Sequence, residues 1–444
     1  MINRRSAILV WGAAEIVYIV AIAGRTSFGV AGLEAVDRFQ ITAAVLSLFT
    51  VLQVGVYAGA QIPVGVLLDR YGTRKVLLSG ALIMAAGQLL LAVAHTLPWA
   101  LGARVLIGLG DATAFTAVLR LVPRWFHPLR VPVMTQLVGI TGQIGQVISS
   151  LPFAYILVKI GWTPAFSFLA ALGGVAFVIS YFLVIDNPPQ PQDGAAPAPE
   201  FHSPALVPAT RRTHRTFRDV LREPGAWLAF WSHWVGNFPN STFLLLWGVP
   251  FLQVHNSYSA QTAAALLLVT TVCGIFFGPV TGRLTAQHPL RRTWIVYAAS
   301  CIMFFIWLVI LLLPAPAPDF LIVLLLISLS AVGAASSVAF DFTRTSVAPR
   351  RLGTANGLAN MGGFIATLIT AALIGIALDL STGGAPTTAN DYKVAMSMQV
   401  ICWAIGMVGI EISKRQTRKE IAEYGIRVPR MREAIRREWR RREK

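Results

Sequence analysis

The sequence predicts an all-α integral membrane protein with twelve membrane-spanning helices. Hydrophobic residues make up 55% of the 444 positions and charged residues only 13%, and the mean hydropathy is +0.63. A soluble globular chain of this length would not have such a composition. Only helices and closed barrels satisfy their backbone groups in lipid, and the apolar runs are too long and too little alternating for barrel strands. We therefore expect helices throughout.

Each apolar run is about as long as a bilayer requires, since a hydrocarbon core of about 30 Å takes roughly 20 helical residues. The first run is long enough to span and no small-residue cleavage site follows it, so we expect it to remain in the protein. The predicted spans are 8–30, 41–64, 75–95, 98–120, 131–157, 163–185, 224–252, 259–281, 293–313, 319–340, 352–378 and 394–413.

The basic residues predict the orientation of these spans. The net charge is +17, and most of the 37 Lys and Arg residues lie in the two terminal segments and in every second loop. The alternate loops hold only Arg38, Lys159 and Lys393. Cytoplasmic loops carry such an excess of positive charge, so we expect both termini to be cytoplasmic and the protein to lie in the cell membrane. Nucleic-acid binding is disfavoured because the charge is not gathered on one face.

One composition break divides the chain. Seven prolines fall between residues 188 and 208, followed by a basic segment that ends at Arg222, which is typical of an extended linker. We expect a six-helix bundle over 1–186, a cytoplasmic linker over 187–222, a second six-helix bundle over 223–413 and a basic cytoplasmic tail over 414–444. The tail either is solvated or lies on anionic lipid head groups.

A loop motif after the second span points to a family. The segment reads Gly65-Val66-Leu67-Leu68-Asp69-Arg70-Tyr71-Gly72-Thr73-Arg74-Lys75, and a weaker copy, from Gly282 to Arg292, follows the eighth span. The first segment resembles the signature loop of the major facilitator superfamily, whose members are two six-helix bundles that rock about a central binding site. The resemblance implies close helix approach at Gly65 and a conformational latch formed by Asp69, Arg70 and Arg74.

Charged residues inside the spans predict the site, because such residues are costly in a membrane and usually functional. The fourth span carries Arg104 and Asp111, which seven residues of helix place on one face, about 10.5 Å apart along the axis. The Arg-x-x-x-Gly-x-Gly pattern from Arg104 resembles the fourth-helix motif of the superfamily, and the carboxylate after it resembles the anion:cation symporter branch. Arg25, on the first span, is similarly placed in organic-anion members, although Gly24 stands where that branch usually has Asp.

The expected roles follow from these charges. Arg25 and Arg104 would bind the charge of the substrate, unless Arg25 snorkels to the interface. Asp111 would carry the proton, with Glu15 as a second candidate. Further polar residues within the spans are expected to line an aqueous route, although interhelical hydrogen bonding is the alternative role. They are Gln53, Tyr57, Gln143, Asn237, Asn240, Asn356 and Asn360.

We therefore predict a secondary active transporter that imports a small organic anion with protons by alternating access. Proton-driven export of drugs or metabolites, exchange of the nitrate or sugar-phosphate type, and a transporter-like receptor remain open. An enzyme is not expected, because the sequence lacks a nucleophile elbow, a phosphate loop and paired catalytic carboxylates. The cysteines Cys273, Cys301 and Cys402 lie in apolar spans without paired spacing, so neither a metal site nor a cofactor is expected. The expected oligomeric state is a monomer.

Overall fold

The computed structural model describes residues 4–41, 43–188, 217–383, 385–423 and 425. Within these ranges every regular element is helical. The Pro-rich part of the predicted linker and most of the predicted basic tail lie outside the described residues.

The N-terminal half contains six spans. Five are single helices, whereas the fifth span in chain order has a π turn at Pro152, where the proline removes a backbone donor. A short amphipathic helix, α2, follows the first span and was not predicted. The elements are α1 (Arg4–Val30), α2 (Gly32–Phe39), α3 (Ala43–Tyr71), α4 (Thr73–Val93), α5 (Leu97–Trp125), α6 (Val131–Ile148), the π turn η1 (Ser149–Phe153), α7 (Ala154–Ile160) and α8 (Trp162–Leu183).

The C-terminal half repeats this plan with more interruptions, because its first, fourth and sixth spans are each built from two helices. The elements are α9 (Phe217–Arg222), α10 (Pro224–Thr242), the π turn η3 (Phe243–Trp247), α11 (Gly248–Asn256), α12 (Ala260–Gln287), α13 (Arg292–Leu312), α14 (Asp319–Ser336), α15 (Ala339–Ser346), the 3₁₀ turn η4 (Pro349–Arg351), α16 (Leu352–Thr382), α17 (Ala389–Ser397) and α18 (Gln399–Glu423).

Eleven of the described helical segments are long and apolar enough to cross a bilayer. The remaining predicted span, the seventh at 224–252, corresponds to α10, η3 and α11, residues 224–256, which run on without a break. Polar residues such as His233, Asn237 and Asn240 lower the mean hydropathy of this segment. The twelve-helix fold predicted from the sequence is therefore confirmed.

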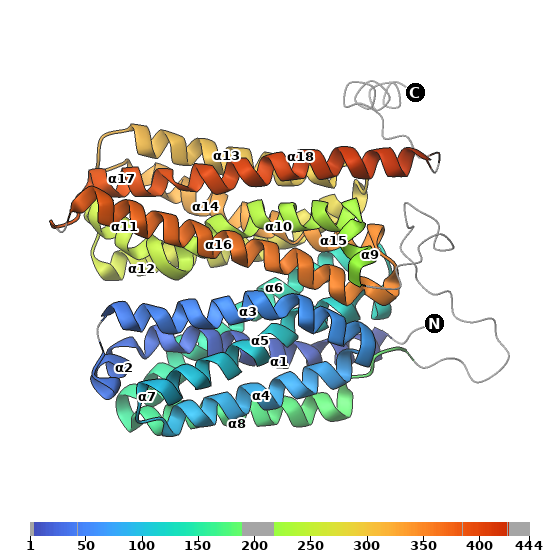
Figure 1. The fold of residues 1–444 in the computed structure, drawn as a ribbon, viewed down its shortest axis with the longest axis horizontal. Helices are drawn as coiled ribbons and strands as arrows, with labels where there is room; N and C mark the ends of the chain where they lie inside the picture. Colours follow the sequence, from blue (N-terminus) through green and yellow to red (C-terminus); the bar gives the residue numbers. More distant parts are fainter. Residues whose placement is uncertain (1–3, 42, 189–216, 384, 424, 426–444) are drawn as a thin grey trace.

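The two halves lie side by side with their helices nearly parallel to one long direction (Figure 1). The start of α1 and the end of α18 lie at the same end of this bundle, which we call the basal end (Figure 1). Helix α16 of the C-terminal half crosses obliquely and meets α3 of the N-terminal half near this end (Figure 1). A second contact between the halves joins α6 to α12. The surface between the halves therefore consists mainly of these four helices.

Candidate functional site

Two oppositely charged side chains meet in the middle of the N-terminal half. Arg25 of α1 donates from Nε to Asp111 Oδ2 and from Nη2 to Asp111 Oδ1, both at 2.8 Å. The Asp111 side chain is fully buried and that of Arg25 is 13% exposed. Because Asp111 is the central residue of α5, the ion pair lies at mid-depth. Two parallel charge-assisted hydrogen bonds are the strongest arrangement that these two groups can form.

Side chains of α3 and α16 cover the guanidinium of Arg25. Its Cζ lies 4.3 Å from the centroid of the Tyr57 ring and 5.5 Å from that of Phe364. The two rings are 4.6 Å apart, and Asn360 Nδ2 donates to the Tyr57 hydroxyl at 2.9 Å. Since Phe364 and Asn360 belong to the C-terminal half, the Arg25–Asp111 pair lies where the two halves meet.

Arg104 occupies a different place, although it lies two turns from Asp111 on the same helix. Its side chain is almost completely buried, and its Cζ lies 4.7 Å from the centroid of the Phe28 ring. One hydrogen bond, from Nη1 to the carbonyl oxygen of Gly24 at 3.4 Å, is long. Its Nε has no partner among the described residues. Two arginines thus interact with the single carboxylate of Asp111.

The structure gives a steric reason for glycine at position 24. A Cβ at this position would lie 2.6 Å from Gln88 Nε2. The Gln88 amide therefore fills the space that an aspartate would need, and Gln88 would have to move to admit one.

Glu15 lies toward the basal end from Arg25 and is also buried. Its Oε2 accepts a hydrogen bond from the Thr141 hydroxyl at 2.7 Å, which connects α1 to α6. Its Oε1 has no partner in the described part of the chain. The Tyr18 ring lies within electrostatic range of both Glu15 and the Arg25–Asp111 pair. The two buried carboxyl groups are therefore close enough to influence the same tyrosine.

The remaining polar residues predicted from the sequence fall into different surroundings. Gln53 is buried and its side chain lies near the Asp111 carboxylate, yet its amide makes no hydrogen bond of good geometry among the described residues. Gln143 is exposed on α6. Asn356 accepts from the Thr343 hydroxyl at 2.6 Å and so joins α15 to α16. Of these residues, Gln53 lies nearest to the ion pair, whereas Asn356 connects helices.

The C-terminal half contributes a polar group on α10. Asn237 accepts from the Ser241 hydroxyl at 3.2 Å, while Asn240 Oδ1 has no partner within the described ranges. His233 was not singled out from the sequence, although a histidine inside a span deserves the same functional hypothesis as a carboxylate. Its ring lies 5.1 Å from that of Phe340, and its Nε2 also lacks a partner among the residues described.

Asp69 joins the two halves at the basal end. Its carboxylate accepts from the backbone nitrogens of Gly353 and Thr354, each at 2.8 Å, and from the Thr354 hydroxyl at 2.6 Å. These residues form the first turn of α16, whose backbone donors have no partner within the helix. A carboxylate there also interacts favourably with the helix dipole. Asp69 of one half therefore caps a helix of the other.

The basic partner of Asp69 differs from the predicted one. Arg120, at the end of α5, lies 3.6 Å from Asp69 Oδ1. Arg70 instead lies over the Tyr71 ring, at 5.1 Å, and Arg74 over the Tyr181 ring, also at 5.1 Å. Arg70 lies at the end of α3 and Arg74 in the first turn of α4, and each guanidinium group faces an aromatic ring. In this structure the basic residue beside Asp69 is therefore Arg120, and the latch role of Arg70 and Arg74 stays a prediction.

Glycines allow the backbones of α3 and α16 to come together beside Asp69. A Cβ on Gly65 would lie 2.5 Å from the carbonyl oxygen of Gly353, and a Cβ on Gly357 would lie 2.2 Å from that of Gln61. Such distances exclude a side chain unless the helices separate. The close approach expected at Gly65 is thus seen against α16.

The comparisons with known proteins agree on the family. A sequence profile described as the Major Facilitator Superfamily matches residues 15–371. The probable L-galactonate transporter of Escherichia coli (strain K12) is 21% identical over 424 residues, with 92% of this chain and 88% of that protein covered.

Other likenesses cover less of the relative or show the fold alone. The probable anion transporter 2, chloroplastic, of Oryza sativa subsp. japonica is 25% identical over 329 residues, or 69% of this chain, and the chain spans only 58% of its length. The crystal structure of the Major Facilitator Superfamily transporter FucP in the outward conformation superimposes with a TM-score of 0.64 at 14% identity, covering 92% of this chain and 99% of that one. The chain therefore belongs to the Major Facilitator Superfamily.

Proposed function

We propose that the protein is a secondary active transporter that imports a small organic anion together with a proton by alternating access. The observation that carries the proposal is the Arg25–Asp111 ion pair, buried at mid-depth where the two halves meet. We place the basal end in the cytoplasm, as the distribution of basic residues favours.

The ion pair suggests how substrate binding could be coupled to proton binding, because the substrate and Asp111 would compete for Arg25. A substrate carboxylate offers Arg25 the same two oxygens that Asp111 offers, so one set of bidentate hydrogen bonds can replace the other. Asp111 would then be left buried without its strongest cation, and an isolated buried carboxylate is costly while it is charged. Uptake of a proton by Asp111 removes this cost. Binding of the anion and binding of the proton would thus favour each other.

The charges near the pair favour an anionic substrate. Arg25 and Arg104 both interact with Asp111, so protonation of Asp111 leaves two positive charges that an anion can balance. Glu15 is proposed as a second proton carrier, because its carboxyl group is buried and, among the described residues, its hydrogen-bond partner is the uncharged Thr141. Amide and hydroxyl groups of Gln53, Tyr57, Asn237 and Asn240 suit a hydroxylated substrate. We therefore propose a sugar acid, the class of compound named for the L-galactonate transporter of E. coli.

The contacts between the halves favour an outward-facing state for this structure. Asp69 binds the first turn of α16 near the basal end, and Gly65 and Gly357 bring the two backbones together there. Access from the basal end is therefore obstructed. In the proposed cycle these contacts break when the substrate leaves toward the cytoplasm.

The test is transport by the purified protein in proteoliposomes, with labelled L-galactonate or D-galactonate as the first substrates. Asp111→Asn imitates the protonated carboxyl group. We expect it to lose accumulation driven by a pH gradient but to retain counterflow exchange, which needs no net proton movement. Asp319→Asn is the matched control, because Asp319 is exposed at the start of α14 and should leave both activities unchanged.

Each outcome separates one part of the proposal from another. Accumulation by Asp111→Asn at the wild-type level would remove Asp111 as the proton carrier. Wild-type uptake that ignores the pH gradient altogether would identify a uniporter or an exchanger. Failure of every sugar acid, with transport of cationic drugs instead, would overturn the anion assignment.

A further inference from the structure

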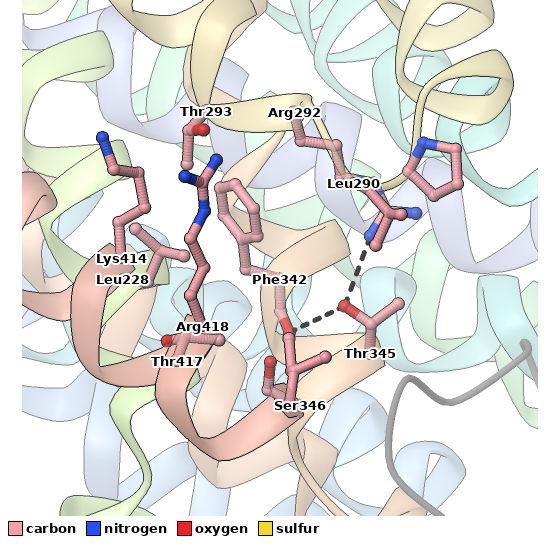
Figure 2. A pocket seen from close by; sticks show the side chains of 12 residues that line it. Leu228, Leu290, Arg292, Thr293, Phe342, Thr345, Ser346, Lys414, Thr417 and Arg418 are labelled. Atoms are coloured by element: carbon pink, nitrogen blue, oxygen red, sulfur yellow. Dashed lines mark hydrogen bonds between the residues drawn. The ribbon is translucent and has the colours of Figure 1, made fainter. Parts of the chain in front are cut away.

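A small cavity opens at the basal end of the C-terminal half, away from the site described above. It lies between α10, α13, α15 and α18 and has a volume of about 40 Å³. Figure 2 shows its lining, with Arg418 extending from α18 toward Thr293 at the start of α13. Three basic residues, Arg292, Lys414 and Arg418, line the cavity and no acidic residue does.

Arg292 is the residue that most needs a further partner. It is 4% exposed, and its Nη1 donates to the carbonyl oxygen of Asp341 and to the Thr345 hydroxyl, both at 3.2 Å. Its Nε has no partner among the residues that the structure describes. A buried cationic donor without an acceptor is costly. An anion in the cavity would remove this cost.

The N-terminal half shows what occupies the equivalent position there. Helix α4, the third span, begins at Thr73, and the carboxylate of Asp186, just beyond the sixth span, accepts from the backbone nitrogens of Thr73 and Arg74. Helix α13 is the third span of the other half, and its N-cap residue makes no side-chain capping bond. The last span of that half presents Lys414 and Arg418 instead of a carboxylate. The internal anion of one half is thus replaced by cations in the other.

The nearby acidic groups already have basic partners. Asp341 accepts from Arg344 Nη2 at 2.6 Å, and Glu411 pairs with Lys414 and with Arg415. The cavity would admit on the order of three water-sized groups, which suits the oxygens of a phosphate rather than a whole sugar. Large apolar side chains are exposed on two of the helices that line the cavity. They include Trp294 on α13 and Val408 and Ile412 on α18. They offer a surface for acyl chains.

We propose that this cavity binds the phosphate group of an anionic phospholipid in the leaflet at the basal end. The phosphate caps α13 and accepts from Arg292 and Arg418, while Lys414 adds charge at the rim. Basic pockets between spanning helices recognise lipid head groups in this way. Lys414 and Arg418 belong to the first residues of the predicted basic tail, which form the last turns of α18.

The test uses the full-length protein, purified in detergent and stripped of lipid. Its thermal unfolding is followed by tryptophan fluorescence, and bound lipids are counted by native mass spectrometry. Dioleoyl phosphatidylglycerol is compared with dioleoyl phosphatidylcholine, which has the same chains but no net charge, and with inorganic phosphate. We expect phosphatidylglycerol to raise the midpoint temperature of unfolding by several degrees more than phosphatidylcholine does. A ligand that binds only the folded state stabilises that state by mass action.

Two substitutions on one helix make the test specific. Arg418→Gln should weaken phosphatidylglycerol binding at least tenfold and remove one bound lipid from the mass spectrum. Arg415→Gln is the control, since its side chain is 74% exposed and pairs with Glu411 outside the cavity, and it should bind as the wild type does. Arg292→Gln should weaken phosphatidylglycerol binding in the same way.

Three results would overturn the proposal. They are equal stabilisation by the two lipids, equal losses in Arg415→Gln and Arg418→Gln, and a shift with millimolar inorganic phosphate as large as that with phosphatidylglycerol. The first two would indicate nonspecific attraction, and the third a soluble anion in place of a lipid.

Discussion

The contact of Asp69 with α16 should set the balance between the two conformations of the protein. Asp69→Asn is the smallest change that tests this, because it removes the charge and keeps the shape. In the structure the carboxylate accepts three hydrogen bonds from the other half, two from backbone nitrogens and one from a hydroxyl. An asparagine can keep one acceptor oxygen, while its amide group would face donors.

The magnitude follows from these bonds. Hydrogen bonds to a charged group contribute about 1.5–3 kcal/mol each, and neutral ones about 0.5–1.5 kcal/mol. An asparagine oxygen in the place of Oδ2 keeps two bonds in weaker form and loses the one from Gly353, which should cost the basal-closed state about 3 kcal/mol. Since about 1.4 kcal/mol is a factor of ten, the ratio of closed to open molecules should fall roughly 100-fold. The fold itself should survive, because both halves keep their internal packing.

The assay is a distance measurement by double electron–electron resonance. Spin labels are placed at Tyr71→Cys on α3 and Arg350→Cys on η4, both exposed positions at the basal end, after the three native cysteines have been replaced. The parent protein should show mainly the short distance of the closed state. Asp69→Asn should add a longer distance as a major population. Asp37→Asn, an exposed residue of α2 at the opposite end, should match the parent.

One result would refute this reasoning. If Asp69→Asn keeps the parent distance distribution and also the parent transport rate in proteoliposomes, the hydrogen bonds to α16 do not bias the equilibrium. A variant that loses its folded melting transition would be replaced by Asp69→Glu. That variant keeps the charge and should lengthen the contact without abolishing it.

Three further predictions concern the packing, the charge site and the orientation. Gly65→Ala should also favour the open state, since its Cβ would lie 2.5 Å from a backbone oxygen of α16, whereas Gly59→Ala on the same helix meets open space and should be neutral in the same distance measurement. Arg25→Lys should weaken anion binding by about 1–3 kcal/mol, because an ammonium cannot form the two parallel bonds of a guanidinium; unchanged affinity in a binding titration would exclude Arg25 from the site. A reporter active only in the cytoplasm should work when fused after Lys75 and fail after Tyr258, and activity at the second position would reverse the orientation.

The fold could be predicted from the sequence because it depends on properties of single segments. A run of about 20 apolar residues spans a bilayer whatever its neighbours are. The same reasoning did not show that some spans are broken, as at Pro152 and after Thr242. A π turn changes neither the length nor the hydropathy of a span.

The candidate site was predicted only in part. The sequence singled out Arg25, Arg104 and Asp111, since any charge inside a span stands out against apolar neighbours. It associated Arg104 with Asp111 through their spacing on one helix, whereas the partner of Asp111 is Arg25 of another helix. His233 was missed although it lies four and seven residues before Asn237 and Asn240 on one span, a spacing that places all three on one helix face.

What the sequence determined by itself is the class of protein, the number of spans and the expected orientation, all of which follow from apolar length and the placement of charge. Only the tertiary structure decided which charges meet. Arg25 and Asp111 are 86 positions apart in the chain, and Asp69 and Gly353 are 284 apart. Such partners depend on how helices rotate and cross when they pack, and side chains of every span contribute to that packing. Helical periodicity relates residues within one helix, so it does not predict contacts between two helices.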